Sequence, residues 1–425
     1  MASTSGSALG WLDYREEDAR LVRELLRAFE EKGTLDSIGI GTVRDALADV
    51  LFPGLSTLHT RARYFFFLPW VYRGLERDVR EGHVGAARAA MVARQREAQL
   101  IDALIEGGAE QQGIIGVRAR EKVRTLPRDV YWSGLRRFGF LLFGGTSRSY
   151  LESLGQRRPT RVAQVRTDDG ESLAGALGAA WRPGIPPAPD DLLESATFDL
   201  TAQEAAYLLE RIVESVPGSL LAELAQRRPE VDGIDMPWHV PGFGDLPART
   251  RESVAHAEMF STVMFGAQVL YNELLVAQMR ADAGGGAPDN LTHADEAIAA
   301  ARDQWLVLME DASPRIAAWD RRDFWHVVLE ENPRIPLPTR AFIDRWLDAA
   351  TADGEAALAD DTLQRAVADR EQVLKGSLAR LRNPRARELA DPPFGLEPLN
   401  YRWLAIGRTL VTDIAQGLEQ GGAHA

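Results

Sequence analysis

The residues best suited to chemistry combine acids with arginines near the N-terminus. Asp45 stands one helical turn before Asp49 and directly after Arg44. Two carboxylates beside an arginine can hold one acid ionised and poised for acid–base or electrostatic work. The same spacing also fits ordinary charges on a helix surface, which is the more common case. Both interpretations stay open at this point.

The segment that follows sets two arginines against a run of aromatic residues. Arg61 and Arg63 stand directly before the apolar run at residues 64–67. A run this apolar predicts burial, and a guanidinium beside it needs an anionic partner. Either Asp45 or Asp49 supplies that partner, which makes a structural clamp, or a bound anion does, which makes a phosphate or nucleic-acid site. The sequence favours the clamp.

Two further stretches could contact a ligand. Tyr131 and Trp132 precede Arg136 and Arg137, and the four-residue spacing from Trp132 to Arg136 puts both on one helix face. Such a face suits base stacking with phosphate contact, or core aromatics beside exposed arginines. The apolar stretch at residues 256–275 carries a polar stripe, whose members are Glu258, Ser261, Gln268 and Asn272. These side chains either form hydrogen bonds within the protein or line a water-filled pocket.

Helical periodicity dominates the elements that must position these side chains. We expect helices near residues 14–32, 42–51, 84–106, 128–143, 201–215, 248–281, 292–311, 339–351, 360–382 and 399–419, and a long helix from Ser56 that Pro69 kinks or breaks. Two irregular excursions, at residues 155–197 and 228–247, interrupt the pattern. The sequence therefore predicts an all-α, multi-helix globular protein. Its expected parts are an N-terminal helical domain (1–155), a linker or ordered loop excursion (156–197) and a C-terminal helical domain (198–425).

Composition narrows the class of protein. The 425 residues contain no cysteine, which excludes disulfides and thiolate metal sites. The histidines show no metal-binding spacing, and no phosphate loop or dinucleotide fingerprint is present, so we expect neither metal nor organic cofactor. No apolar run reaches membrane-spanning length, and the N-terminus lacks a signal pattern. Three lysines against 46 arginines indicate a high-GC bacterial genome. We expect a cytoplasmic protein without a membrane partner.

The charge is unevenly distributed. The whole chain carries a net charge of -13, yet residues 116–166 hold twelve basic and three acidic residues, a net of +9. This basic island predicts a surface that binds nucleic acid through its positive charge. The alternative is a solvent-exposed helix face whose charges pair with acidic helices elsewhere in the protein. The island's arginines at the predicted DNA contact are Arg118, Arg120, Arg124, Arg136 and Arg137.

Several blocks together resemble a known family. They are GWLDY at residues 10–14, the stretch from GIGTVRDALADV to TRARYFFFLPWVY at residues 39–72, LPRDVYWSGLRR at 126–137, and the later LYNELL and NYRW. The chain resembles, over nearly its whole length, an uncharacterised bacterial family that occurs in phage-defence gene neighbourhoods. It is similar to defence DNA glycosylases that remove glucosylated hydroxymethylcytosine from phage DNA. A helix–hairpin–helix glycosylase signature with its downstream catalytic aspartate is not evident.

The resemblance implies a DNA glycosylase that flips a modified cytosine out of double-stranded phage DNA and leaves an abasic site. Such an enzyme needs a carboxylate for the cationic sugar, which Asp45 or Asp13 would supply. Phosphate contacts would come from Arg44, Arg61, Arg63 and the arginines of the basic island. The base pocket would use Tyr64, Tyr131, Trp132, Glu258, Gln268 and Asn272. The alternatives are a non-catalytic DNA-binding adaptor that works with other proteins of a defence operon, and a helical protein that docks a partner through the basic island.

Overall fold

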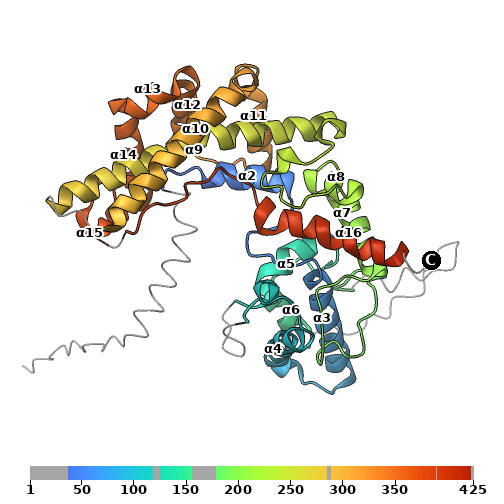
Figure 1. The fold of residues 1–425 in the computed structure, drawn as a ribbon. Coiled ribbons are helices and arrows are strands. Elements are labelled where there is room, and N and C mark those ends of the chain that lie inside the picture. The colour runs from blue at the N-terminus through green and yellow to red at the C-terminus, as the bar shows by residue number, and fades with distance from the viewer. Residues whose placement is uncertain (1–36, 118–124, 156–178, 285–288, 389, 423–425) are drawn as a thin grey trace, which may run out of the picture. The chain divides into compact units, whose positions relative to one another are not determined.

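A computed structural model describes residues 37–117, 125–155, 179–284, 289–388 and 390–422. Helices joined by turns and loops make up these residues (Figure 1). The described part of the chain contains no strand, only an isolated antiparallel bridge between Leu141 and Trp181. The all-α prediction is therefore confirmed. None of the described helices combines the length and the apolar character needed to cross a membrane.

The contacts divide the chain into two compact units, which differ from a division in sequence order. Unit 1 comprises Met1–Val43, Met259–Trp319 and Arg334–Leu399, and its structure is described from residue 37 onward. Unit 2 comprises Arg44–Glu258, Asp320–Pro333 and Asn400–Ala425. Two of the five boundaries fall inside helices, α2 (Gly41–Leu51) and α9 (Ala248–Ala283). Much of the linker predicted at 156–197 lies outside the described residues, so the expected domain boundary stays a prediction.

Unit 2 contains the larger set of helices. They are α3 (Tyr64–Glu81), α4 (Ala89–Glu106), α5 (Pro127–Arg137), α6 (Ser147–Ser153), α7 (Ala202–Ser215), α8 (Leu220–Arg227), α11 (Arg321–Glu331) and α16 (Arg408–Gly422). Short 3-10 helices add η1 (Ala86–Arg88), η2 (Gln111–Gly113), η5 (Pro237–His239) and η6 (Phe243–Asp245), the last two within the predicted excursion at 228–247. A π-helix, η8 (Trp403–Gly407), leads into α16.

Unit 1 packs α10 (Asp289–Ala317), α12 (Leu337–Ala352), α13 (Gly354–Ala359), α14 (Asp361–Lys375), η7 (Gly376–Leu378) and α15 (Pro384–Arg387) with its part of α9. Trp305 of α10 and Trp346 of α12 are fully buried, and their indole N–H groups donate to the carbonyls of Thr262 and Val263 on α9. Gly266 makes this approach possible, because a Cβ there would stand 2.2 Å from the Trp305 ring.

The aromatic run of the sequence forms the centre of unit 2. Tyr64 and residues 65–68 are 0% exposed, which confirms the predicted burial. The Phe65 ring packs 5.1 Å from that of Phe138, and Phe66 lies 5.5 Å from Phe140. Large aromatic side chains bury most apolar area per residue, so this cluster carries much of the stabilisation of the unit.

Several predicted helix boundaries were wrong, including the end of the helix predicted at 360–382, which is Lys375, and the start of the one predicted at 399–419, which is Arg408; the helix predicted near 14–32 lies outside the described residues. Two of the errors have a clear local cause. The long helix begins at Tyr64 instead of Ser56, because Ser56 and His59 close a turn: the Ser56 N–H donates to His59 Nδ1 at 2.8 Å. Pro69 lies inside the helix, which continues to Glu81. Helix α5 ends at Arg137 instead of residue 143, because Gly139 adopts a left-handed φ of 71° and the next residues pair with the segment at 180–182.

Candidate functional site

Arg61 is an internal clamp, not a free phosphate contact. Its Nε and Nη2 donate to the two carboxylate oxygens of Asp413 at 3.1 and 2.8 Å. The Ala62 N–H donates to the same carboxylate at 2.9 Å. The preference for a clamp is supported, but the partner predicted from the sequence, Asp45 or Asp49, is wrong. The partner comes instead from α16, which the fold brings next to the start of α3.

Arg63 forms a second internal clamp. Its Nε and Nη2 donate to the Glu204 carboxylate at 3.0 and 3.1 Å, and Nη1 donates to the Thr197 carbonyl at 3.0 Å. The guanidinium also lies over the rings of Phe67 and Trp70. Glu204 is buried and also caps α7 through the Thr201 N–H. These contacts use the hydrogen-bonding capacity that a phosphate contact would need.

The aromatic residues expected in a base pocket are buried in unit 2. The Tyr131 hydroxyl donates to the Arg61 carbonyl and accepts from the Thr60 N–H, both at 2.9 Å. The Tyr64 hydroxyl accepts from the Ile115 N–H at 3.0 Å, and the Trp132 indole donates to the Gly145 carbonyl. Burial raises the pKa of both tyrosines above the ordinary range. These three side chains shape the core and fix its loops.

The polar stripe on α9 is satisfied in part: Ser261 Oγ is buried without a hydrogen-bond partner within the described residues, whereas Gln268 and Asn272 contact the backbone of unit 1. Asn272 donates to the Phe394 carbonyl and accepts from the Phe394 N–H, both at 2.8 Å. Hydrogen bonding requires the Gln268 amide to be oriented with its nitrogen toward the carbonyls of Gly395 and Glu397, which it then meets at 3.0 and 3.2 Å. Both residues therefore hold the loop at 394–397 in unit 1. Glu258 belongs to unit 2, so the stripe is divided between the units.

Four predicted residues lie outside the described residues. They are the candidate catalytic Asp13 and three arginines of the basic island, Arg118, Arg120 and Arg124. Arg136 and Arg137, at the end of α5, are described and exposed.

The remaining predicted residues lie on α2. Arg44 Nη2 lies 2.8 Å from Asp45, whose side chain is 55% exposed. Arg402 Nη1 donates to Asp49 and to the Leu55 carbonyl, both at 2.6 Å. Asp45 and Asp49 thus each have their own arginine, and neither serves Arg61.

Two residues from other helices join this group. Arg137 lies against the turn after α2, because a Cβ built on Gly54 would stand 2.8 Å from the Arg137 Cγ. Glu331 ends α11 close enough to Asp49, Arg137 and Arg402 for their charges to act on it. We call this set the acid–arginine cluster: Arg44, Asp45, Asp49, Arg137, Glu331 and Arg402.

The backbone that presents Arg402 is strained. Tyr401 and Arg402 both adopt left-handed conformations, with φ of 52° and 72°. This costs residues other than glycine about 1 to 2 kcal/mol each. The neighbouring side chains hold the conformation: the Tyr401 hydroxyl donates to the Ala257 carbonyl at 2.7 Å, and the Trp403 indole donates to the Ile234 carbonyl at 2.8 Å. Strained residues and π-helices are both enriched at functional sites, and here η8 follows directly.

Within the cluster, Glu331 has a perturbed pKa. Partial desolvation, and next the negative charge of Asp49, raises the pKa of Glu331, although much of the residue is exposed. Asp49 instead accepts a charge-assisted hydrogen bond from Arg402. Glu331 therefore retains a proton more readily than an ordinary glutamate does.

Sequence analysis missed Glu331 and Arg402 as members of this site. Arg402 lies 353 residues after Asp49, and no spacing rule joins them. The signal in the sequence was the arginine between two aromatic residues in NYRW at residues 400–403.

A second polar group lies at the end of α3. The ligand atoms of Asp78, Glu81 and His83 all lie within 4.8 Å of one another. The left-handed turn at Gly82 brings His83 back toward the helix, which a search for histidine pairs does not detect. Asp78 is already paired with Arg96, so the group is not a free set of metal ligands.

The fold and the cluster define an all-α protein with an arginine-clamped acidic site. The chain belongs to a family of unknown function, DUF6361, whose model matches residues 6–417. This agrees with the expected membership of an uncharacterised family. Neither a curated protein nor a solved structure matches the chain.

Proposed function

We propose that this protein is a cytoplasmic DNA glycosylase of anti-phage defence. In this proposal it excises a modified cytosine, with glucosylated hydroxymethylcytosine as the expected target, and leaves an abasic site. The observation that carries the proposal is the strained Arg402, which clamps Asp49 beside a second acid, Glu331.

The chemistry assigns roles within the cluster. As the glycosidic bond breaks, positive charge develops on the sugar, and a fixed carboxylate stabilises it. Asp45 and Asp49 are the candidates for this role, and Glu331 is the candidate acid or base that exchanges a proton with the base or with water. Arg44, Arg136 and Arg137 are the candidates for phosphate contacts. Arg61 and Arg63 are left out of the phosphate-binding set, because buried acids already hold them.

A non-catalytic DNA-binding adaptor of a defence operon is the second candidate. It is favoured by the internal roles of Arg61, Arg63, Tyr64 and Tyr131, which remove much of the expected base-binding machinery. Exposed arginines such as Arg136 and Arg137 would still suit the phosphates of double-stranded DNA.

One experiment separates the two candidates. The protein is incubated with glucosylated phage DNA and with unmodified DNA, and both abasic sites and released base are measured. Asp45→Asn and Asp49→Asn keep side-chain size but remove the charge. The substitution at the true carboxylate should lower base release on the order of 100-fold while DNA binding persists. DNA binding without any abasic site would replace the glycosylase by the adaptor.

A further inference from the structure

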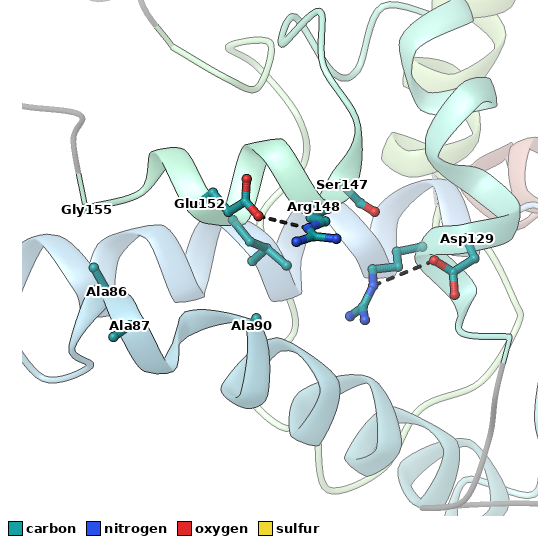
Figure 2. Close-up of a pocket in the computed structure, with 10 residues that line it drawn as sticks. Ala86, Ala87, Ala90, Asp129, Ser147, Arg148, Glu152 and Gly155 are labelled. Carbon is teal, nitrogen blue, oxygen red and sulfur yellow. Dashed lines mark hydrogen bonds and ion pairs between the residues drawn. The ribbon is translucent and has the colours of Figure 1, made fainter. Parts of the chain in front are cut away.

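A cavity of about 820 Å³ lies in unit 2, and none of its lining residues belongs to the acid–arginine cluster. One wall carries Ala86, Ala87 and Ala90 from η1 and the start of α4 (Figure 2). The opposite wall is α6, with Ser147, Arg148 and Glu152, and the start of α5 contributes Arg128 and Asp129. We call this cavity the alanine groove. Its volume falls in the range of about 300 to 1,000 Å³ that is typical of small-molecule sites.

Hydrogen bonds to the buried Glu97 fix the position of Arg128 in the groove. Its Nη1 donates to Glu97 Oε1 at 2.7 Å, and its backbone N–H donates to Glu97 Oε2 at 3.1 Å. Glu97 is 0% exposed, and the Tyr72 hydroxyl donates to it at 2.8 Å. A guanidinium held in this way loses little conformational freedom when a ligand arrives.

The outer edge of the same guanidinium remains available. Nη2 makes no hydrogen bond within the described residues, and Nε lies 3.8 Å from Asp129 Oδ1, beyond hydrogen-bond distance. Asp129 accepts one hydrogen bond, from the Leu126 N–H, and has capacity for more. The groove therefore offers a pair of donors directly beside a carboxylate acceptor.

The charges of the groove argue against a phosphate. The charge of Arg128 is balanced by Glu97, and Arg148 pairs with Glu152 at 2.9 Å, which leaves Asp129 as the additional charge. An anion would meet no excess of positive charge. The alanine wall and Leu151 instead suit the face of an uncharged ring.

We propose that the alanine groove binds a guanine base, either as a free nucleoside or as an unpaired base in a nucleic-acid strand. Arg128 Nε and Nη2 donate to guanine O6 and N7, the pairing by which arginine most often reads guanine. The Asp129 carboxylate accepts from guanine N1–H and the N2 amino group. This proposal does not depend on the glycosylase function.

The test is a titration of the full chain with nucleosides, in which calorimetry or ligand-observed NMR measures binding. Guanosine should bind. Inosine lacks the N2 amino group and 7-deazaguanosine lacks the N7 acceptor, so each should bind on the order of 10-fold more weakly. Adenosine binding as well as guanosine, or displacement of guanosine by inorganic phosphate, would overturn the proposal.

Variants locate the site. Asp129→Asn keeps size and a hydrogen-bonding side chain but turns one acceptor into a donor, and Ala90→Phe fills the groove; both should abolish guanosine binding. Arg77→Ala changes an exposed arginine of α3 that does not line the groove and should leave binding unchanged. Circular dichroism checks that each variant folds. Guanosine binding that survives both groove variants would show that the site lies elsewhere.

A second arm separates the two sources of guanine. Single-stranded oligonucleotides with one guanine are compared with oligonucleotides that carry thymine instead. If a guanine-dependent difference vanishes in Asp129→Asn, the base is read within a strand. If guanosine alone shows this dependence, the ligand is free. Absence of guanine-dependent binding in both arms rejects the proposal, and base release from modified DNA is measured separately, so the two functions fail independently.

Discussion

The carboxylate of Asp413 lies in the core of unit 2, and Arg61 supplies the charge that balances it. Burial raises the pKa of Asp413, while the hydrogen bonds and charge of Arg61 oppose that shift. The pair shows what single residues contribute here: the arginines with enclosed acid partners hold the fold, and exposed ones remain for contact with other molecules.

Arg61→Ala should destabilise the protein by about 3 to 5 kcal/mol, because it leaves a buried carboxylate without its partner. Chemical unfolding monitored by circular dichroism measures the loss. Arg148→Ala, which breaks an exposed pair with Glu152, is the control and should leave the unfolding midpoint unchanged. Unfolding of Arg61→Ala at the wild-type midpoint would contradict the clamp.

His59 makes stability depend on pH. The Ser56 N–H donates to Nδ1 at 2.8 Å, so the ring proton lies on Nε2, which has no hydrogen-bond partner among the residues that the structure describes. Burial lowers the pKa of His59 from 6.5 to about 4. Because the folded-state pKa is lowered, the stabilisation is fully present above about pH 6.5 and is lost as the pH falls toward 4.

The free energy of unfolding should therefore fall by up to about 3 kcal/mol between pH 7 and pH 4 through this group alone. His59→Gln should reduce that pH dependence, while His83→Gln, at an exposed histidine, should keep it. Urea unfolding at several pH values measures the difference. Equal pH profiles for the wild type and His59→Gln would show that other groups control the acid response.

At the scale of elements, the turn between Tyr401 and η8 determines where Arg402 points. Arg402→Gly and Arg402→Ala both remove the contact with Asp49, but only glycine adopts the left-handed backbone without strain. The glycine variant should be more stable than the alanine variant by about 1 kcal/mol. Equilibrium unfolding measures this gap. If the cluster is catalytic, both variants should lose base release equally; equal stability would mean that the backbone relaxes.

The elements also show how far sequence patterns reach. Apolar spacing and breakers predicted most of the longer helices and the buried run at residues 64–67, because these properties are local. Helices α6, α8, α11, α13 and α15 were not predicted. The start of α3 and the end of α5 were missed, because a side-chain turn at Ser56 and pairing with a distant segment decided them. The partners of Arg61 and Arg63 lie 352 and 141 residues away, beyond any local pattern. The ion pair of Asp45 with its neighbour Arg44 is local, and the sequence already placed these two residues side by side.

At the scale of the whole molecule, a net charge of -13 opposes general attraction to polyanions. DNA binding should therefore depend on the basic island at residues 116–166. If about five phosphates are contacted, the logarithm of the binding constant should fall with the logarithm of salt concentration with a slope near -4 to -5. Fluorescence anisotropy at several salt concentrations measures this slope.

Neutralising the arginines of the island together should flatten the slope; they are Arg118, Arg120, Arg124, Arg136 and Arg137. A variant that neutralises exposed arginines of unit 1, at Arg345, Arg365 and Arg385, controls for net charge and should keep the slope. An unchanged slope in the island variant would assign the island to a protein partner or to solvent.

The clamp between Arg61 and Asp413 has a consequence for synthesis in the cell. The two residues are 352 positions apart, and a ribosome that adds about 5 to 20 residues per second needs roughly 20 to 70 s to travel between them. During that time Arg61, beside the aromatic core, has no Asp413 to pair with, and Asp49 has no Arg402. Native packing of this core must therefore follow translation of the last helix, which makes the nascent chain a natural client for chaperones.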